Sequence, residues 1–362
     1  MFAKLKSITV NMIAGANVAT VIVMLLTGYA GQLDAAAHPT LSSMSIVFPF
    51  MAAFNLLFLF FWLVFKWRMA LIPFVGFLLA FVPMRTYCPV NLPASPPDDA
   101  LKVLSWNVEL YTGHPRYTDA FDVIYDYLRD TKADIVCLQE DHDEWRSKKK
   151  HIDELFAYND TVRFKTTGSI NAIGLHTRFP IVRRERISYT SRANGSMAWF
   201  LNVNGDTVIV INNHLESNHL SSDDRSHYQQ IVQGYMQRDT ARAESKRLLG
   251  KLAEAAAQRA PQAEAVHRYI EEHRGYRIIV CGDFNDHPLS YARHTVSDGL
   301  TDCYITTGNG PGWSFNLSGF NFRIDNIMCS PDIKPYQCKI DSKIDASDHY
   351  PIICWMKMPL KP

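Results

Sequence analysis

The sequence is poor in charge at one end and has no long basic run. The rest of the chain carries charge at ordinary globular density, with acidic residues slightly more numerous than basic ones. Duplex nucleic-acid binders usually show a basic stripe, because phosphate neutralisation dominates their affinity. A basic surface for nucleic acid is therefore not expected. Separately, the change from a charge-poor N-terminal part to ordinary charge density predicts a domain boundary near residues 86–100. From Met1 to Pro89 the only charged residues are Lys4, Lys6, Asp34, Lys66, Arg68 and Arg85.

Cysteine and histidine clusters with the spacing of zinc ligands are also missing, as are internal repeats and low-complexity segments. The seven cysteines are an odd number, and three of them lie in apolar, strand-like runs where a buried, inert thiol is expected. Cys303, Cys329 and Cys338 could pair in an oxidising compartment. The sequence does not decide their redox state.

Long apolar runs occur near the N-terminus. Ser7 to Leu33 and Pro39 to Phe65 are uncharged, and each exceeds the roughly 20 residues that cross a bilayer. Met69 to Met84 has 16 residues, so it crosses only with help from the residues up to Pro89, or it forms a re-entrant hairpin. We predict a transmembrane anchor of residues 1–85 with about three helices (about 8–30, 44–65 and 69–85), then a Pro-rich linker, 86–100, and a soluble domain, 101–362.

The distribution of lysine and arginine predicts the orientation of this anchor. Lys4 and Lys6 precede the first span, Lys66 and Arg68 separate the second from the third, and the connection around Asp34 has no basic residue. The positive-inside bias places the N-terminus and the Lys66 turn in the cytoplasm. Three crossings put the soluble domain outside the membrane and two put it inside; we favour outside. The spans contain no ionisable residue, so we interpret them as a membrane anchor rather than as a transport pathway.

After residue 100, short apolar runs bounded by turn residues recur, which is a strand pattern. Helical patterns lie between them at Tyr117–Arg129 and at Asp223–His273. Strands and helices do not alternate strictly, so we predict an α+β domain in which two sheets pack face to face with helices outside. The predicted strands are Leu101–Trp106, Ile135–Leu138, Ala172–His176, Ala198–Val203, Val208–Asn212, Tyr276–Cys281, Ile324–Cys329 and Ile352–Met356.

Polar and acidic residues follow these strands in short motifs. A single carboxylate at a strand end is usually a turn former, but strands of one sheet bring their ends to a common edge, where many carboxylates can converge. Converging carboxylates repel each other unless a cation neutralises them, and oxygen ligands favour Mg²⁺ or Mn²⁺ over Zn²⁺. The motifs are Ser105-Trp106-Asn107-Val108-Glu109, Gln139-Glu140, Asn213-His214-Leu215-Glu216, Gly282-Asp283-Phe284-Asn285, Arg323-Ile324-Asp325-Asn326 and Ser347-Asp348-His349.

These motifs, in this order, resemble those of the endonuclease/exonuclease/phosphatase superfamily, over about Leu101 to Met358. This superfamily has the DNase I-like fold and includes apurinic endonucleases, bacterial sphingomyelinases and inositol-polyphosphate 5-phosphatases. The resemblance implies a four-layer α/β/β/α sandwich and a metal-dependent hydrolase of phosphate esters. With the predicted anchor, it places the protein in a bacterial inner (cytoplasmic) membrane, multi-pass, with an extracytoplasmic catalytic domain.

The resemblance also implies a metal site built from acidic and amide residues. Glu140 in the Gln-Glu motif corresponds to the principal metal ligand, and Asp348 lies near the metal. Asn107 corresponds to a residue that holds the phosphate or a metal-bound water. Glu109 stands where some members have aspartate, and we count it among the metal residues. The expected cofactor is Mg²⁺ or Mn²⁺.

The catalytic residues implied by the same motifs are Asp283, Asn285, His349, Asp325 and His214. Asp283 and Asn285 would orient or deprotonate the attacking water, and His349 would contact the scissile phosphate with its tautomer fixed by Asp325. Either Asp283 or His349 is the base. His214 corresponds to a histidine of the DNase and sphingomyelinase branches, where apurinic endonucleases have tyrosine. It would bind substrate together with Asn107 and Asn285.

Residues outside the motifs receive structural interpretations. His142, His219, His227, His287 and His294 are expected at the surface or at helix caps, and Arg323 is expected to pair structurally. Arg225, Arg238, Arg242 and Lys246 could meet an anionic substrate, although a solvated helix face is favoured. Trp313 to Phe322 is either a substrate-facing loop or a packed turn.

The sequence therefore predicts a membrane-anchored phosphodiesterase or phosphatase. Its expected partners are a phosphorylated substrate and the lipid bilayer, and no protein partner is evident. Tethering and the slightly acidic domain favour a phospholipid headgroup or a small phosphorylated molecule over duplex DNA. An extracytoplasmic nuclease is the alternative, and a non-catalytic membrane scaffold is the alternative of another class.

Overall fold

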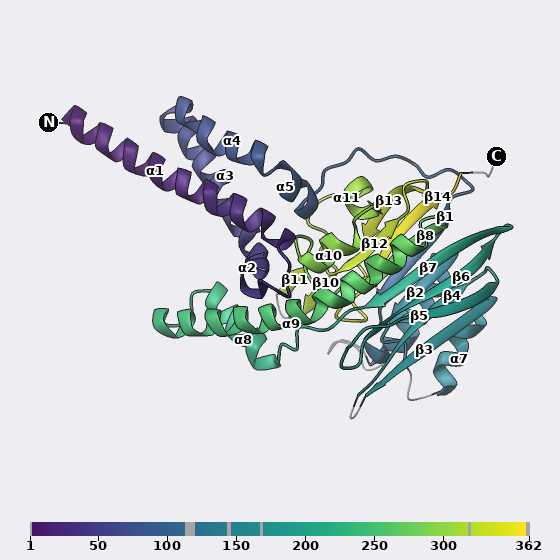
Figure 1. Cartoon of the computed structure of the whole chain (residues 1–362). Helices are drawn as coiled ribbons and strands as arrows, with labels where there is room; N and C mark the ends of the chain where they lie inside the picture. Colours follow the sequence, from purple (N-terminus) through teal and green to yellow (C-terminus); the bar gives the residue numbers. More distant parts are fainter. Residues whose placement is uncertain (1, 113–119, 143–145, 167–168, 318–319, 360–362) are drawn as a thin grey trace.

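The computed structural model describes residues 2–112, 120–142, 146–166, 169–317 and 320–359. An elongated set of N-terminal helices projects from a β-rich domain (Figure 1). The set comprises α1 (Phe2–Tyr29), η1 (Ala30–Gln32), α2 (Pro39–Ser43), η2 (Met44–Val47), α3 (Phe48–Phe65), η3 (Trp67–Ala70), α4 (Leu71–Leu79) and α5 (Phe81–Tyr87).

Two of these N-terminal segments are long and apolar enough to cross a membrane, Ser7–Gln32 and Pro39–Phe65. A third is added if the pair Trp67–Leu79 and Phe81–Tyr87, bent by 66°, is one span. The bend has a local cause. Pro83 has no N–H to donate to the carbonyl oxygen of Leu79, and the hydroxyl of Tyr29 donates to that oxygen instead, at 2.7 Å.

A buried polar network joins α1 to α3. The Nδ2 of Asn17 donates to the Oδ1 of Asn55 at 3.0 Å, and the indole N–H of Trp62 donates to the Oδ1 of Asn17 at 3.1 Å. The hydroxyl of Thr20 contacts the same Oδ1 of Asn55. Asn17, Asn55 and Trp62 are buried. Hydrogen bonds between buried polar side chains stabilise the association of helices, because an unpaired polar group in an apolar medium is costly.

The β-rich domain contains two six-stranded mixed sheets. One has the order β13 (Lys334–Ile340), β14 (Ile352–Lys357), β1 (Leu101–Asn107), β2 (Ile135–Gln139), β4 (Ser169–Thr177), β3 (Tyr158–Thr166). The other has the order β5 (Ile181–Ile187), β6 (Gly195–Val203), β7 (Asp206–His214), β8 (Arg277–Asp283), β12 (Asp325–Cys329), β9 (Thr301–Asp302). A separate hairpin pairs β10 (Phe315–Leu317) with β11 (Phe320–Phe322).

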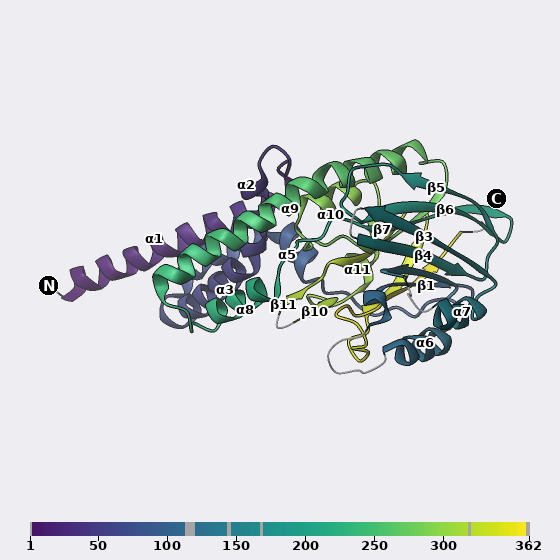
Figure 2. The same cartoon turned by 90° about the horizontal axis from the view of Figure 1, so that it is seen from below.

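The sheets and helices form four layers. Inward-facing residues of the two sheets make one apolar core, exemplified by Val103, Trp199 and Ile279. Leu104 and Val136 pack outward on α6 (Ala120–Thr131), beside α7 (Arg146–Glu154). The other sheet packs on the second half of α9 (Arg238–Glu272) and on α10 (Tyr291–Val296). This confirms the predicted α/β/β/α sandwich, whose layers are seen from below in Figure 2.

Every predicted strand is present. Most are extended by one to three residues, whereas β8 and β12 each begin one residue later than predicted. The long helical stretch predicted at Asp223–His273 is wrong as a single element, because it is divided into α8 (Ser222–Val232) and α9 at Gly234, which has a φ of +73°. The start predicted for α6 at Tyr117 lies outside the described residues. All seven cysteines are free, and the Sγ atoms of Cys303 and Cys329 lie 3.7 Å apart in the core between the sheets.

The N-terminal helices are docked on the β-rich domain. Leu289, from the loop before α10, is buried with Met24, Phe48 and Ala52 of α1 and α3. At Gly31 the contact is so close that a Cβ would lie 1.6 Å from the carbonyl oxygen of Leu289. Glycine is therefore needed at this position because the two backbones meet there.

A second contact, made by Arg323, joins the N-terminal helices to the β-rich domain. The guanidinium of Arg323, which is 2% exposed, donates to the carbonyl oxygens of Thr86 and Pro311 and to that of Tyr87 at 3.4 Å. Burial lowers the pKa of Arg323, and the carbonyl oxygens satisfy its donors. This confirms the structural role predicted for Arg323, which joins the end of α5 to the β-rich domain.

Replacing Gly31 with valine is expected to separate the helices from the β-rich domain, because the new side chain overlaps the Leu289 carbonyl. Limited proteolysis of the linker, residues 88–100, should then become at least several times faster in detergent. Gly15→Val is the matched control, since no atom lies within 4 Å of a Cβ at that position. Equal cleavage rates for the two variants would show that the docked contact is not formed in solution.

Candidate active site

The two parallel strand pairs bring polar side chains to one edge of the sandwich. β1 pairs in parallel with β2, and β7 with β8, so that Asn107 lies beside Gln139 and His214 beside Asp283. Gly282 has a φ of +134°, and a Cβ there would lie 2.0 Å from the carbonyl oxygen of Asn213. Only glycine fits this close approach, which delivers Asp283 to the shared edge.

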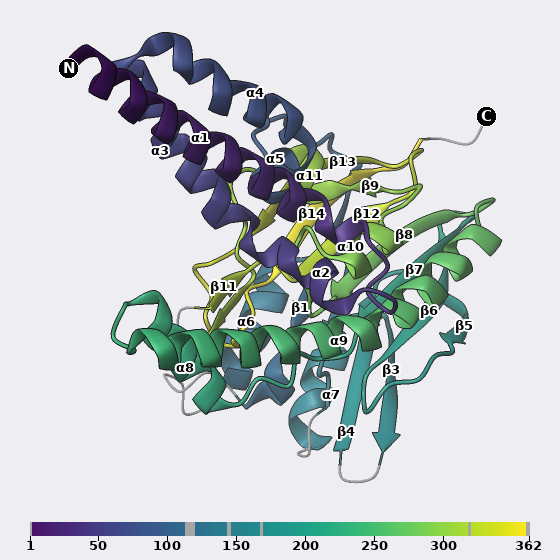
Figure 3. The same cartoon turned by 60° about the vertical axis from the view of Figure 1, so that its left-hand side comes forward.

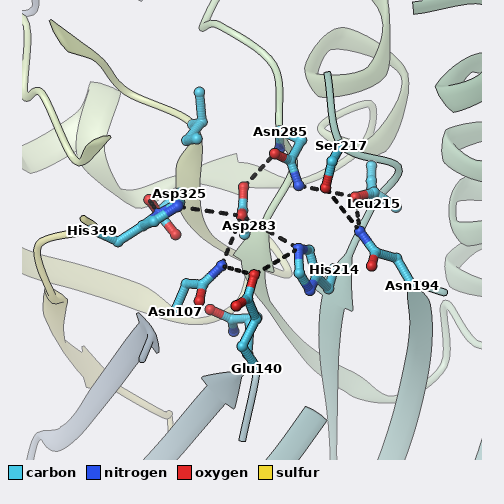
Figure 4. A network of polar contacts seen from close by, with 12 residues as sticks. Asn107, Glu140, Asn194, His214, Leu215, Ser217, Asp283, Asn285, Asp325 and His349 are labelled. Atoms are coloured by element: carbon cyan, nitrogen blue, oxygen red, sulfur yellow. Dashed lines mark hydrogen bonds and ion pairs between the residues drawn. The ribbon is translucent and has the colours of Figure 1, made fainter. Parts of the chain in front are cut away.

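Asp283 is the centre of the cluster that Figure 4 shows. Its Oδ2 accepts from the Nδ2 of Asn107 at 3.2 Å and lies 3.6 Å from the Nε2 of His214 and 3.7 Å from the Nε2 of His349. Its Oδ1 accepts the backbone N–H of Asn285 at 2.8 Å. Burial raises the pKa of Asp283, the nearby imidazole of His349 opposes the rise, and Asp325 adds to it.

His349 is held by a carboxylate and by its own backbone. Its Nδ1 lies 2.8 Å from the Oδ2 of Asp325, which is fully buried behind it on β12. Its carbonyl oxygen accepts from the indole of Trp106 at 2.8 Å. Burial alone would lower the pKa of His349, but Asp325 and Asp283 raise it well above the ordinary value. Nε2 is thereby directed toward Asp283 and the cavity.

His214 is held as a neutral donor. Its Nδ1 contacts the Nδ2 of Asn171 at 3.0 Å, and because an amide nitrogen only donates, Nδ1 accepts and Nε2 carries the proton. Asn171 is fixed in turn by Asn194, whose Oδ1 accepts its second N–H at 2.9 Å. Burial lowers the pKa of His214, with Asp283 opposing the change. The Nε2–H faces Asp283 and Glu140.

Three carboxylates form the acidic wall of the site. The Oε2 of Glu109 accepts the backbone N–H of Asp348 at 3.2 Å, and the Oε1 of Glu140 accepts from the Nδ2 of Asn107 at 3.3 Å. Burial, then Asp348, raise the pKa of Glu109 to about 7. Burial and the same neighbour raise the pKa of Glu140 to about 7. A divalent cation would offset this repulsion, so the donor set fits a hard metal ion.

A second metal geometry exists in the same cluster. Asp283, Asp325 and His349 offer ligand atoms that lie within 4.8 Å of one another. We favour the acidic wall as the cation site, because Nδ1 of His349 is taken by Asp325 and the trio is fully buried. Glu140, by contrast, keeps 27% and Asp348 17% of the side chain exposed, and both border the cavity.

Strained backbone marks the same positions. Glu109, Glu140 and Asn285 have φ values of 46°, 55° and 52°, in the left-handed region that non-glycine residues rarely adopt. Such strain persists where the surrounding structure imposes it, and it is common at functional sites. Beside Glu140, the buried carboxylate of Asp141 accepts from the hydroxyl of Thr161 at 2.7 Å and from that of Tyr111, which fixes this turn.

The cluster opens into a cavity of about 360 Å³. Eight of the nine residues predicted from the motifs line it, and the ninth, Asp325, lies behind His349. The amide of Asn285 is partly engaged, since its Nδ2 donates to the carbonyl oxygen of Leu215 at 3.0 Å. The lining residues among the predicted set are Asn107, Glu109, Glu140, His214, Asp283, Asn285, Asp348 and His349.

The structure adds residues that the motifs did not identify. Asn171 orients His214 from a neighbouring sheet, and no sequence pattern links the two positions. The surface position expected for His287 is wrong, because its side chain is 8% exposed and borders the cavity. Phe315 and Phe322 of the β10–β11 hairpin also border the cavity. The rings of Phe315 and His349 form a T-shaped contact, with their centroids 5.1 Å apart. This favours the substrate-facing interpretation of Trp313 to Phe322.

Comparisons with family models found matches for two parts of the chain. Residues 104–349 match the model of the Endonuclease/Exonuclease/phosphatase family, whose members hydrolyse phosphoester bonds and generally use divalent metals. Residues 10–87 match a domain of unknown function (DUF8431). No curated protein matches the chain.

Similar solved structures share the fold. The crystal structure of humanized D. rerio TDP2 with 14 mutations is 16% identical, with a TM-score of 0.51, and the match covers 72% of this chain and 99% of that one. An endonuclease/exonuclease/phosphatase from Beutenbergia cavernae DSM 12333 has the same identity and TM-score and covers 72% of both chains. One from Bacteroides vulgatus is 14% identical, with a TM-score of 0.50, and covers 72% of this chain and all of that one.

Proposed function

This chain belongs to the endonuclease/exonuclease/phosphatase family, and from that premise we propose that it is a membrane-anchored, divalent-metal-dependent hydrolase of phosphodiesters or phosphomonoesters. The observation that carries the proposal is the convergence of Asp283, His349 and Glu140 on one cavity from distant parts of the chain. Hydrolysis at phosphorus needs an in-line water, neutralised phosphoryl oxygens and help for the leaving oxygen. The cluster has a residue of the right chemistry for each task.

Asp283 is the base in this proposal. Its Oδ2 faces the cavity side of the cluster and is the atom closest to both imidazoles, while its Oδ1 is held by the Asn285 backbone. A water near Oδ2 can therefore give up its proton as it attacks phosphorus. Asn285 positions this carboxylate through the backbone contact.

The two histidines stabilise the phosphoryl group from different sides. Asp325 holds Nδ1 of His349, so Nε2 is the atom that meets a phosphoryl oxygen. His214 donates from its Nε2 because Asn171 occupies Nδ1. The amide of Asn107 donates to both Asp283 and Glu140 and so holds these two carboxylates beside the bound substrate. The two histidine donors are fixed and need no rearrangement as charge develops.

Mg²⁺ or Mn²⁺ is the cofactor in this proposal, held by Glu140 together with Glu109, Asp348 and Asn107. When bound, the cation supplies charge neutralisation on the phosphoryl oxygens. The residues of the acidic wall would keep it beside the cavity. Burial is the main cause of the raised pKa values of Glu109 and Glu140, and repulsion from Asp348, which a cation would relieve, adds to it.

The N-terminal helices are the membrane anchor in this proposal. α1 and α3 are the spans, and α4 with α5 form a third, bent crossing. Three crossings, together with the basic residues Lys4, Lys6 and Lys66, support an extracytoplasmic hydrolase domain at a bacterial inner membrane. The substrate is a phospholipid headgroup or a small phosphorylated molecule at that surface.

A substrate panel tests this function with the full chain in detergent and Mg²⁺. We expect turnover of bis-p-nitrophenyl phosphate and of a phospholipid phosphodiester, and loss of both with a chelator. Strong nicking of plasmid DNA without lipid turnover would instead favour an extracytoplasmic nuclease. Binding of substrates without any turnover would favour a scaffold, and the proposed function would then be wrong.

A further inference from the structure

The catalytic cavity is completed by the N-terminal helices. Ser42, Ser43, Ser45 and Ile46, from α2 and η2, line it opposite the acidic wall. Figure 3 shows α2 lying between the first helices and α9, beside α10 of the β-rich domain. The segment Ser42–Ile46 lies near the start of the second apolar segment, Pro39–Phe65, so the N-terminal helices contribute directly to the site. We call it the serine wall.

The serine wall is held in place by a specific contact. Nδ1 of His287 accepts the backbone N–H of Leu289 at 3.3 Å, so its Nε2 carries the proton and donates to the Oγ of Ser45 at 3.2 Å. Ser45 in turn donates to the carbonyl oxygen of Ser42 at 2.6 Å. Ala35, just before the wall, packs on Ala256 and Ala260 of α9.

Two polar groups in the cavity have no partner within the described residues. The Oγ of Ser43 is buried and makes no hydrogen bond there. The guanidinium of half-buried Arg225, on α8, also makes no hydrogen bond or ion pair with the part of the chain that the structure describes, although it lines the cavity. Buried polar groups are normally paired, so the Oγ of Ser43 points to a polar ligand. Arg225 is only half-buried, but a guanidinium that lines this cavity without a carboxylate partner suits an anionic group of that ligand.

The basic residues near Arg225 do have ion-pair partners. Arg247 and Lys251 of α9 each lie 2.6 Å from a carboxylate oxygen of Asp224. That carboxylate also receives the backbone N–H of Ser221. The Asp224 carboxylate is therefore already paired with Arg247 and Lys251, and it forms no ion pair with Arg225, which lines the cavity.

The serine wall also lies at the depth of lipid headgroups. α3 begins at Phe48, two residues after Ile46, and runs for 18 residues that are apolar except for Asn55. If α3 spans the membrane, the wall lies in the headgroup layer, which is roughly 5–7 Å thick on each side of the hydrocarbon core. Leu41 and Met44, on the same segment, are 53% and 36% exposed.

α8 and the first half of α9 border the other side of the cavity. In Figures 1 and 3 they project past the sheets on the same side as α1 and α3. Leu220 and Leu252 give this side of the cavity apolar surface. At the tip of the projection Val232 and Tyr235 are 58% and 81% exposed, which suits contact with a bilayer surface.

We propose that the serine wall and Arg225 select a lipid phosphoester with an anionic headgroup, which enters from the bilayer between α2 and α8 while its acyl chains stay in the membrane. This inference rests on the proposed function and names its substrate class. Ser43 binds the headgroup, Arg225 pairs with its anionic group, and the phosphoester reaches Asp283 and His349 without leaving the interface.

The test compares lipid with soluble substrate, using the full chain reconstituted in vesicles with Mg²⁺. The probes are vesicles of phosphatidylserine, whose headgroup carries a carboxylate separate from the phosphodiester, vesicles of phosphatidylcholine, which lacks that carboxylate, and bis-p-nitrophenyl phosphate in solution. We expect phosphatidylserine to be turned over faster than phosphatidylcholine. Arg225→Gln should raise the apparent KM for phosphatidylserine about tenfold, as expected for one lost charge-assisted contact, and Arg225→Lys should restore part of it.

Ser43→Phe fills the wall and should lower the ratio of lipid turnover to soluble turnover by about tenfold. Leu41→Phe and Arg242→Gln are the matched controls, because both residues are exposed and do not line the cavity. Leu41 lies on α2 with Ser43, and Arg242 lies on α9, the helix that follows α8. Both controls should keep the wild-type ratio.

The outcomes separate the two claims. Hydrolysis of the soluble ester without lipid turnover, or Ser43 and Arg225 variants with the wild-type ratio, would overturn the lipid inference and leave the hydrolase intact. Preference for phosphatidylcholine would overturn the role of Arg225. Absence of Mg²⁺-dependent hydrolysis of every probe would instead overturn the proposed function.

Discussion

Asp283→Asn is expected to lower kcat for bis-p-nitrophenyl phosphate about a thousandfold, within the range that general-base catalysis contributes. Asparagine keeps the size of the side chain and the acceptor for the Asn285 N–H, but it cannot take a proton from water. KM should change little, because Asn107, His214 and His349 remain. The measurement is steady-state kinetics of the full chain in detergent at saturating Mg²⁺.

A second buried aspartate provides the control for this experiment. Asp302 is 9% exposed and pairs with Arg293 at 2.6 Å, outside the cavity. Asp302→Asn should lower the melting temperature, because it weakens a buried ion pair, while kcat stays within a fewfold of wild type. Asp283→Asn should show the opposite pattern. A variant at position 283 that keeps more than a tenth of kcat would rule out the carboxylate as the base.

Glu140→Gln should have the second large effect, on metal binding. The carboxylate of Glu140 is the best-placed oxygen donor of the acidic wall, held at the end of β2 in a left-handed conformation and fixed by Asn107. Its neutral replacement removes one charge from the donor set, so the Mg²⁺ concentration that gives half-maximal rate should rise at least about tenfold, as for altered metal sites in general. The rate at saturating Mg²⁺ should recover in part.

Glu185→Gln is the matched control, since Glu185 lies on β5, away from the cavity. Its Mg²⁺ titration should coincide with that of the wild type. If Glu140→Gln also gives the wild-type titration, the cation is held elsewhere, and the trio Asp283, Asp325 and His349 becomes the site to test.

The sandwich and its central residues were predictable from the sequence for a definite reason. Buried strands such as Leu101–Asn107 and Arg277–Asp283 are mostly apolar and end in polar motifs, and that change locates both the strand and the side chain at its end. Strands at the edges of the sheets were harder to find. β5 has three exposed arginines and no regular alternation of buried and exposed positions, and β3 is polar at most of its positions.

The partners that hold the catalytic groups were not predictable. Asn171 reaches His214 from another sheet, and His287 reaches Ser45 from another part of the chain, 242 residues away. No local pattern encodes contacts between residues so far apart. For Arg225, the sequence favoured a solvated helix face. The sequence does not reveal that Arg247 and Lys251 form the ion pairs with the neighbouring Asp224, because these contacts depend on the packing of two helices.

The location of bound Mn²⁺ in crystals of the full chain tests the central claim most directly. Anomalous scattering should place the ion within coordination distance of Glu140 and beside Glu109 and Asp348, facing the cavity that Asp283 and His349 share. An ion bound only at the protein surface, or a site away from Glu140, would contradict the account of a single cation gathered by these side chains.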